Sequence, residues 1–258
     1  MIHKTAIVNS KAKISNNVTI GPYSIIGPNV VIGENTVLQS HVNILGDVEI
    51  GKGNKIYPFV SINEPQDLKY KGETTKLIIG NNNKIREYVS INPGTVGGGG
   101  KTVIGNNCLF MVSSHVAHDC QLGNNIIVAN NVAIAGHAII DDNVVIGGNS
   151  AVQQFTRIGK MAMIGGMTGV SQDVIPYGLS LGNRNSLQGL NLIGLRRAKF
   201  ENKDILELSE AYKEIFATKN LTENLSKLNG SFKDNVLVKE VIEFITKDKK
   251  RPICTPFS

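Results

Sequence analysis

Aliphatic or aromatic residues recur at every sixth position along most of this chain. Eleven consecutive hits lie in Ile2–Ile62, three in Ile79–Ile91 and twelve in Ile104–Val170. A period of six fits neither an amphipathic α-helix, at 3.6 residues, nor the alternation of an ordinary strand alone. It is typical of a hexapeptide β-helix, in which short parallel strands stack coil upon coil.

A second set of small or β-branched residues lies two positions before many of these hits. Because strand side chains alternate between faces, both sets are expected to point into the interior. Gly, Asn and Asp fill much of the rest and tolerate the backbone conformations that a corner needs. Three hexads per coil predict about nine coils and a prism roughly 40 Å long. The second inward set includes Val18, Ser24, Val30, Thr36, Val42, Val48 and Val60.

The rhythm breaks twice, over residues 63–76 and 92–102. Loops that leave a rigid scaffold often carry function, although a tolerated insertion is the alternative. The first break holds Asp67 and Lys69 in the sequence QDLKY, which favours function. The second holds Gly97–Gly100 before a Lys-Thr pair, but Thr95 stands where a phosphate-binding loop needs its first glycine, and a strand hexad follows instead of a helix. We therefore expect a flexible excursion there.

The pattern changes to helical periods after Val170. Helices are predicted over residues 192–199, 204–218, 221–228 and 234–246, with Asp204 and Asp234 as N-caps. We therefore divide the chain into a β-helix over residues 1–185 and a small helical domain over residues 186–258. Such a domain would close the end of the stack, which repeat folds generally require.

Composition narrows the setting in which the protein works. The net charge of +6 permits an acidic partner, but no basic run with interleaved aromatics indicates nucleic-acid binding. The three cysteines, Cys108, Cys120 and Cys254, form no CxxC pair, which favours a reducing compartment. No apolar leader and no segment of ~20 apolar residues is evident. The expectation is a cytoplasmic protein without a membrane span.

Candidate chemistry gathers at one corner of the predicted stack. His118 stands two positions after an inward residue, and steps of 18 residues, one coil each, lead to Gly136 and then Gln154. Coils ~4.8 Å apart place His118 and Gln154 roughly 10 Å from one another. Asp119 follows His118 directly and could orient its ring, while His137 adjoins Gly136. One small molecule could contact the whole column.

Three interpretations of this cluster stay open on the residues alone. A histidine near its ordinary pKa of ~6.5 suits proton abstraction at neutral pH, so His118 is a candidate general base. Polar edge residues that meet another subunit are the alternative, particularly for His137. A zinc lyase like the β-helix carbonic anhydrases would use His115, His118 and His137 as a His₃ site. The H-x-x-H spacing of the first pair argues against convergence on one metal.

Several stretches resemble the UDP-N-acetylglucosamine O-acyltransferase family, which begins lipid A synthesis in Gram-negative bacteria. The resemblance covers nearly the whole chain and implies a left-handed β-helix. The related N-acyltransferases carry a uridine-binding domain before their repeats, whereas the repeats here start at residue 2. The matching stretches are IGPYSIIGPNVVIG, QDLKYKGE, IREYVSINPGT, HVAHDCQLGNN, ANNVAIAGH, GGNSAVQQF, IGGMTGVSQDVIPYG and GLNLIGLRR.

The resemblance also implies a reaction and a mechanism. A 3-hydroxyacyl group passes from acyl carrier protein to the glucosamine 3-hydroxyl of UDP-N-acetylglucosamine, without a cofactor. His118 would be the general base, Asp119 would support its imidazolium, and the Gly136 N–H would stabilise the oxyanion. The sugar oxygen attacks the thioester directly, so no cysteine needs to act as a nucleophile.

The same resemblance places the site between subunits of a homotrimer. Gly166, two positions after an inward residue, is expected to extend the His118 column and to leave room for a long chain such as 3-hydroxymyristoyl. Basic residues near Arg197 suit an acidic carrier protein. Gln153, Ile193 and Ala198 depart from the family pattern and leave open whether the sugar is GlcNAc or a 3-amino analogue. The implied substrate-binding residues are Gln66, Asp67, Lys69, His115, His137, Gln154, Gly166, Asn191 and Arg197.

Overall fold

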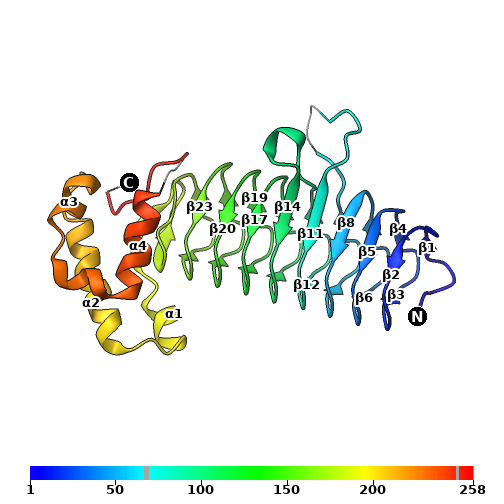
Figure 1. Cartoon of the computed structure of the whole chain (residues 1–258), viewed down its shortest axis with the longest axis horizontal. Coiled ribbons are helices and arrows are strands. Elements are labelled where there is room, and N and C mark those ends of the chain that lie inside the picture. The colour runs from blue at the N-terminus through cyan, green and yellow to red at the C-terminus, as the bar shows by residue number, and fades with distance from the viewer. Residues whose placement is uncertain (67–69, 248–249, 258) are drawn as a thin grey trace.

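The six-residue rhythm produces a stack of short parallel strands that runs along a prism (Figure 1). The computed structural model describes residues 1–66, 70–247 and 250–257. Among these residues the strands form three sheets, of nine, eight and ten members, one on each face. The chain visits the faces in turn, so neighbours in the long stacks are mostly three strands apart in sequence order. The predicted left-handed β-helix with C-terminal helices is confirmed.

The three sheets are named here by their number of strands. The nine-stranded sheet holds β1 (Ile7–Val8), β4 (Ile25–Ile26), β7 (Asn43–Ile44), β10 (Ser61–Ile62), β13 (Ser90–Ile91), β16 (His115–Val116), β19 (Ala133–Ile134), β22 (Ala151–Val152) and β25 (Gly169–Val170). The eight-stranded sheet holds β2 (Lys13–Ile14), β5 (Val30–Ile32), β8 (Asp47–Ile50), β11 (Lys76–Ile79), β14 (Lys101–Ile104), β17 (Gln121–Leu122), β20 (Ile139–Ile140) and β23 (Arg157–Ile158). The ten-stranded sheet holds β3 (Thr19–Ile20), β6 (Val37–Leu38), β9 (Lys55–Ile56), β12 (Lys84–Ile85), β15 (Leu109–Phe110), β18 (Ile127–Val128), β21 (Val145–Ile146), β24 (Met163–Ile164), β26 (Gly178–Leu181) and β27 (Ser186–Leu190).

The interior of the prism is filled by the residues that carry the rhythm. Every sixth-position residue from Ile20 to Val170 is at most 4% exposed, and the second set, from Val18 onward, is equally buried. Ile2, at the open end, is 51% exposed. Burial of branched aliphatic side chains contributes about 25 cal/mol per Å² of apolar surface, and a narrow prism obtains it without large aromatic residues.

Both sequence breaks leave the prism without disturbing its register. Ile62 still pairs with Ile91 across the first break, and Ile79 pairs with Ile104 across the second. The second excursion contains the 3₁₀ turn η1 (Val96–Gly98). In Figure 1 the two excursions project from the same side of the prism, close to β11 and β14.

Helices close one end of the stack. β26 pairs in parallel with β24, and β27 folds back antiparallel on β26, so strand structure continues beyond residue 185 to Leu190. The helical part comprises α1 (Leu192–Arg197), α2 (Asn202–Ile215), α3 (Leu221–Lys227), η2 (Gly230–Asp234) and α4 (Val236–Thr246). No helix in the described part of the chain is long and apolar enough to cross a membrane.

The predicted N-caps are wrong. Helix α2 begins after Glu201, so Asp204 lies inside its first turn, where a carboxylate favours the positive end of the helix dipole. Asp234 ends the 3₁₀ turn η2, and Asn235 caps α4 by accepting hydrogen bonds from Leu237 N–H and Val238 N–H. Asn235 is the residue with an extended backbone, which an N-cap requires.

A buried ion pair joins the helices to the prism. The Arg157 guanidinium donates to Asp173 Oδ2 at 2.7 Å and to the Phe244 carbonyl of α4 at 3.1 Å. The C-terminal segment then returns to the prism, where Ile253 forms a parallel bridge with Asp173. This return brings Lys250 and its neighbours to the corner that follows the nine-stranded sheet.

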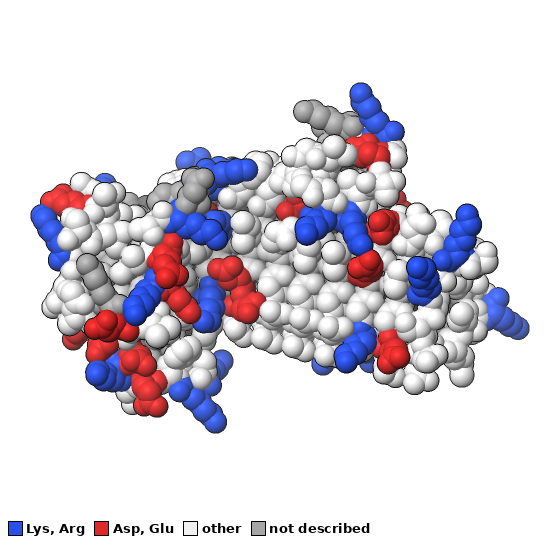
Figure 2. All heavy atoms as spheres, viewed as in Figure 1, with Lys and Arg blue, Asp and Glu red and all other residues white. Residues whose placement is uncertain are grey.

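The charge distribution leaves part of the prism surface apolar. Figure 2 shows Lys, Arg, Asp and Glu gathered near the helical end, the excursions and the N-terminal coils, with a largely uncharged strip between them. Ile139 on β20 is 43% exposed and Ile127 on β18 is 39% exposed.

Candidate functional site

The predicted column forms at the corner that follows the nine-stranded sheet. Val116, Ile134 and Val152 pair in register on β16, β19 and β22. The residues two positions later, His118, Gly136 and Gln154, therefore stack on neighbouring coils and line one groove of about 600 Å³. Gly136 lies so close to His118 that an added Cβ would come within 2.5 Å of its Cε1 and 2.7 Å of its Nε2.

Asp119 and His137 occupy the next position of this corner, where the backbone is left-handed. Their φ angles are 59° and 60°, the conformation that Asn adopts at positions 125, 131, 143 and 149 with φ from 56° to 61°. Non-glycine residues rarely adopt positive φ, and Asn tolerates it best. Functional side chains thus replace the usual corner residue on two successive coils.

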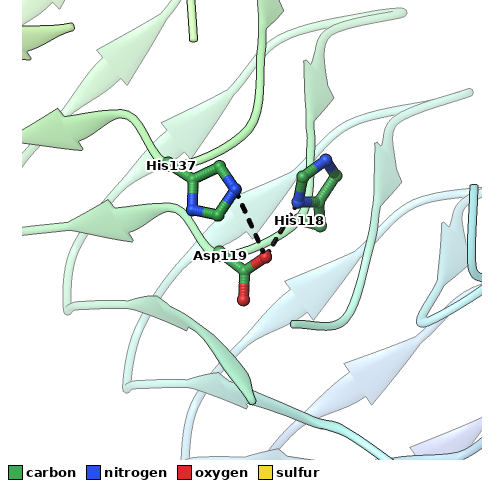
Figure 3. A group of neighbouring side chains, drawn as sticks. All are labelled: His118, Asp119 and His137. Atoms are coloured by element: carbon green, nitrogen blue, oxygen red, sulfur yellow. Dashed lines mark hydrogen bonds and ion pairs between the residues drawn. The ribbon is translucent and has the colours of Figure 1, made fainter. Parts of the chain in front are cut away.

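Asp119 orients the His118 ring. Its side chain is fully buried, and its Oδ2 lies 2.8 Å from His118 Nδ1 (Figure 3). An ionised carboxylate only accepts hydrogen bonds, so Nδ1 carries the proton and the neutral ring has its lone pair on Nε2. Nε2 is the atom next to Gly136. The pair therefore presents a base to the groove.

The second excursion covers the Asp119 carboxylate. The Thr95 N–H donates to Oδ1 at 2.8 Å and the Thr95 hydroxyl donates to Oδ2 at 2.6 Å. Any Cβ on Gly98 would overlap the same carboxylate. The glycine run that we expected to be a flexible excursion instead includes a 3₁₀ turn packed against the functional cluster.

His137 belongs to a stack of rings beside the same carboxylate. Its Nε2 lies 3.8 Å from Asp119 Oδ2, and its ring is edge-on to His118 with 5.1 Å between centroids (Figure 3). Phe155 stacks on its other face at 4.4 Å, and Lys250 Nζ lies 4.5 Å from the Phe155 centroid. Burial lowers the pKa of His137, and Asp119 opposes this shift, while His118 and Lys250 add to it.

His115 is separate from this cluster. Its Nδ1 lies 2.8 Å from the Ser90 hydroxyl, and burial lowers the pKa of its imidazole. Within the described residues, the side chains close enough to share a metal are His118, Asp119 and His137, with ligand atoms within 4.8 Å of one another. The His₃ zinc set of the alternative interpretation is therefore not assembled, because His115 lies outside the group.

A second space, of about 650 Å³, opens on the other side of His118. It is lined by His137, Gln154, Phe155 and Lys250 together with Glu73 and the Thr95–Gly98 turn. The first groove is lined mainly by small apolar residues, including Ala117, Ala133, Ala151 and Val170, with Gln66, His115 and Gln153 among the polar ones. His118 is thus shared by an apolar groove and a more polar space.

The remaining predicted residues lie elsewhere in a single chain. Asn191 caps α1 by accepting from Gly194 N–H, and its Nδ2 donates to the Met161 carbonyl at 2.9 Å. Arg197 is exposed at the end of α1. Asp67 and Lys69 fall outside the described residues. Gln66 lines the groove.

The expected position of Gly166 is wrong. It follows β24 of the ten-stranded sheet, whereas His118, Gly136 and Gln154 follow strands of the nine-stranded sheet. Twelve residues beyond Gln154 advance the chain by two faces, and a full coil needs 18. Gly166 therefore shares a corner with Gly148, whose carbonyl oxygen would lie 3.3 Å from a Cβ at Gly166.

The three cysteines are buried and are expected to be unreactive in the folded protein. Burial raises the pKa of Cys120 to about 12 and that of Cys254 to about 11, and it also raises the pKa of Cys108. At pH 8 roughly one Cys120 in 10⁴ would be a thiolate, the form that reacts. Iodoacetamide should leave the native mass unchanged at pH 8 and add three groups after denaturation. Rapid native labelling with loss of activity would contradict this prediction.

Comparison with known proteins identifies the family. A model of the bacterial transferase hexapeptide matches residues 11–46, 29–64 and 101–136, and a model of UDP N-acetylglucosamine O-acyltransferase, domain 2, matches residues 173–254. The acyl-[acyl-carrier-protein]–UDP-N-acetylglucosamine O-acyltransferase of Rickettsia canadensis is 52% identical over 255 residues, 98% of this chain and 97% of that protein. The chain belongs to the UDP-N-acetylglucosamine O-acyltransferase family. The corresponding protein of Thermodesulfovibrio yellowstonii is 49% identical over 98% of both chains.

Solved structures of O-acyltransferases share the fold over their full length. LpxA from Acinetobacter baumannii superposes with a TM-score of 0.94 at 43% identity, covering 98% of this chain and 99% of that one. The Campylobacter jejuni UDP-N-acetylglucosamine acyltransferase gives 0.90 at 37% identity, covering 99% of each. The protein is accordingly an acyltransferase.

Sequence inspection of this O-acyltransferase missed Thr95, Phe155 and Lys250. Phe155 takes the corner position of Asp119 and His137 one coil further on, so coil arithmetic could have found it. Thr95 and Lys250 come from the excursion and the C-terminal segment, whose paths the repeat does not define. Of the departures from the family pattern, Gln153 lines the groove, while Ile193 is 63% exposed on α1 and Ala198 follows that helix.

Proposed function

We propose that the protein transfers a 3-hydroxyacyl group from acyl carrier protein to the 3-hydroxyl of the glucosamine in UDP-N-acetylglucosamine, the first step of lipid A synthesis. The observation that carries this proposal is the buried Asp119 carboxylate bonded to His118 Nδ1, with Nε2 beside Gly136 in the groove. Membership of the O-acyltransferase family supports the substrate pair, since relatives are named for it.

In this mechanism His118 Nε2 accepts the proton of the sugar hydroxyl as its oxygen attacks the thioester carbonyl. Asp119 stabilises the imidazolium that forms. The negative oxygen of the tetrahedral intermediate accepts a hydrogen bond from the Gly136 N–H, which has no acceptor within the described chain. Collapse of the intermediate expels the carrier thiolate, which takes the proton back from His118. No enzyme-bound acyl group forms, consistent with three buried cysteines.

The groove suits an acyl chain beside a polar acceptor. Ala117, Ala133 and Ala151 give it a shallow apolar floor, and hydrocarbon buried there is removed from water. We propose that Gln66, His115, His137 and Gln154 contact the sugar nucleotide, together with Asp67 and Lys69 from the first excursion.

We further propose that the site is completed in a cytoplasmic homotrimer. Gly166, Asn191 and Arg197 lie at other corners of the prism in one chain, so they would reach the His118 groove from a neighbouring copy. The exposed Ile127 and Ile139 give the prism apolar outer faces that can pack against such a copy. The net charge of +6 suits an acidic carrier protein.

The direct test is mass spectrometry of a reaction that contains the purified protein, UDP-N-acetylglucosamine and a series of 3-hydroxyacyl carrier proteins. One dominant acylated sugar nucleotide is expected, and fragmentation should place the acyl group on the 3-hydroxyl. No product, with zinc bound stoichiometrically in the same preparation, would favour the lyase alternative at His118, Asp119 and His137.

Gly166→Met is expected to shorten the preferred acyl chain. A methionine side chain would occupy the end of the groove that we assign to a neighbouring copy, while a Cβ at this position meets only the Gly148 backbone at 3.3 Å and beyond in its own chain. The carrier-protein series reads out the shift. Gly230→Met is the control, because its Cβ would have open space in the helical part. An unchanged chain preference would contradict the assignment of Gly166 to the groove.

A further inference from the structure

The buried Asp119 carboxylate depends on a residue far from it in sequence. With a fully buried side chain, it must be compensated by hydrogen bonds to remain ionised. His118 Nδ1 supplies one donor, at 2.8 Å. The other two described hydrogen bonds to this carboxylate both come from Thr95, through its N–H to Oδ1 and its hydroxyl to Oδ2.

The Thr95 hydroxyl is directed to the site and is not used by its own loop. Thr95 is the N-cap of the turn Val96–Gly98, yet its side chain makes no capping hydrogen bond. The loop is closed by its backbone, since the N–H groups of Gly98 and Gly100 both donate to the Thr95 carbonyl, at 3.0 and 2.8 Å. The turn would therefore keep these hydrogen bonds without the hydroxyl.

The two donors on Oδ2 fix the geometry of the base. Oδ2 accepts from both the Thr95 hydroxyl and His118 Nδ1, while the Thr95 N–H holds Oδ1. A carboxylate held at both oxygens cannot rotate away from the imidazole. Hydrogen bonds to charged groups are the stronger ones, and they favour the ionised carboxylate over the protonated acid.

We propose that Thr95 is a positioning residue for acyl transfer, holding the Asp119 carboxylate ionised and turned towards His118. The role explains why the second excursion departs from the prism: it carries Thr95 to a carboxylate 24 residues later in the chain. The glycine at position 98 lets the turn approach that carboxylate, where a Cβ would overlap it. The inference rests on the proposed role of His118 as general base.

Thr95→Val tests the hydroxyl while keeping the side-chain shape and the backbone N–H. We expect kcat to fall about 10- to 100-fold, the effect of one hydrogen bond to a charged group, with KM changed less than about threefold. The acid limb of the kcat–pH profile should move to higher pH, because a carboxylate with one donor fewer is protonated more readily. Thr95→Ser keeps the hydroxyl and should restore most of the activity.

Thr168→Val is the matched control. Thr168 is also buried, but its hydroxyl has no hydrogen-bond partner in the described structure and it lies at another corner. Its kcat and pH profile should equal those of the wild type. A wild-type pH profile and kcat for Thr95→Val, or a Thr95→Ser variant as impaired as Thr95→Val, would overturn the proposal. Absence of product with the wild-type protein would instead refute the proposed function itself.

Discussion

Replacing His118 by alanine is expected to lower kcat about 100- to 10,000-fold, the range that general acid–base catalysis supplies. The imidazole is the group bonded to Asp119 that faces the groove, at 2.8 Å from Oδ2. Because the His118 side chain is 22% exposed and lies outside the aliphatic interior, folding should be preserved. The melting temperature should change by no more than ~2–4 °C, the shift that 1 kcal/mol produces in a chain of this size.

Steady-state rates of acylated product formation measure this effect. His3→Ala is the matched control, because His3 is exposed and bonds only to its neighbour Thr5 within the described structure. Wild-type turnover by His118→Ala would remove this residue from the mechanism. If the melting temperature fell sharply as well, His118→Gln would separate loss of the base from loss of packing.

Gly136→Ala is expected to reduce kcat about 100-fold or more, although it adds a single methyl group. That Cβ would lie 2.5 Å from His118 Cε1 and 2.7 Å from Nε2, closer than any real Cβ contact. The ring must therefore move away from the position in which Nε2 meets the substrate. A displacement of 1 Å in a reacting group costs about 100-fold in rate.

Gly148→Ala is the control for this substitution. Gly148 occupies the same hexad position one face away, and its Cβ would meet nothing nearer than the Asn130 carbonyl at 3.3 Å. In a His118→Ala background, Gly136→Ala should cost much less, since the ring it displaces is gone. Equal losses in both backgrounds would mean that Gly136 acts without involving His118.

The sequence was sufficient for the architecture because the repeat is physically strict. Each inward position must be apolar to fill a narrow interior, so the six-residue period marks the strands directly. The same period placed His118, Gly136 and Gln154 in one groove. It failed for Gly166, where counting by 12 residues instead of 18 selected the wrong face.

What lay outside the repeat could not be located from the sequence. Thr95 contacts Asp119 only because the second excursion folds back over the corner, and no periodicity describes that path. Lys250 reaches Phe155 because the C-terminal segment bridges Ile253 to Asp173. Asn191 has the sequence context of a binding residue, yet in one chain its amide caps α1 and contacts Met161.

The unbroken register across both excursions also limits how chain length can change in this protein. Ile62 with Ile91 and Ile79 with Ile104 stay paired because each extra stretch leaves and re-enters at the same corner. Within the coils from β16 to β22, by contrast, removing one hexad would turn every later side chain onto the next face and carry Gln154 away from His118. Length can therefore vary there only by whole coils of 18 residues or by a loop that returns to its starting corner, which makes the interval between these two residues quantised.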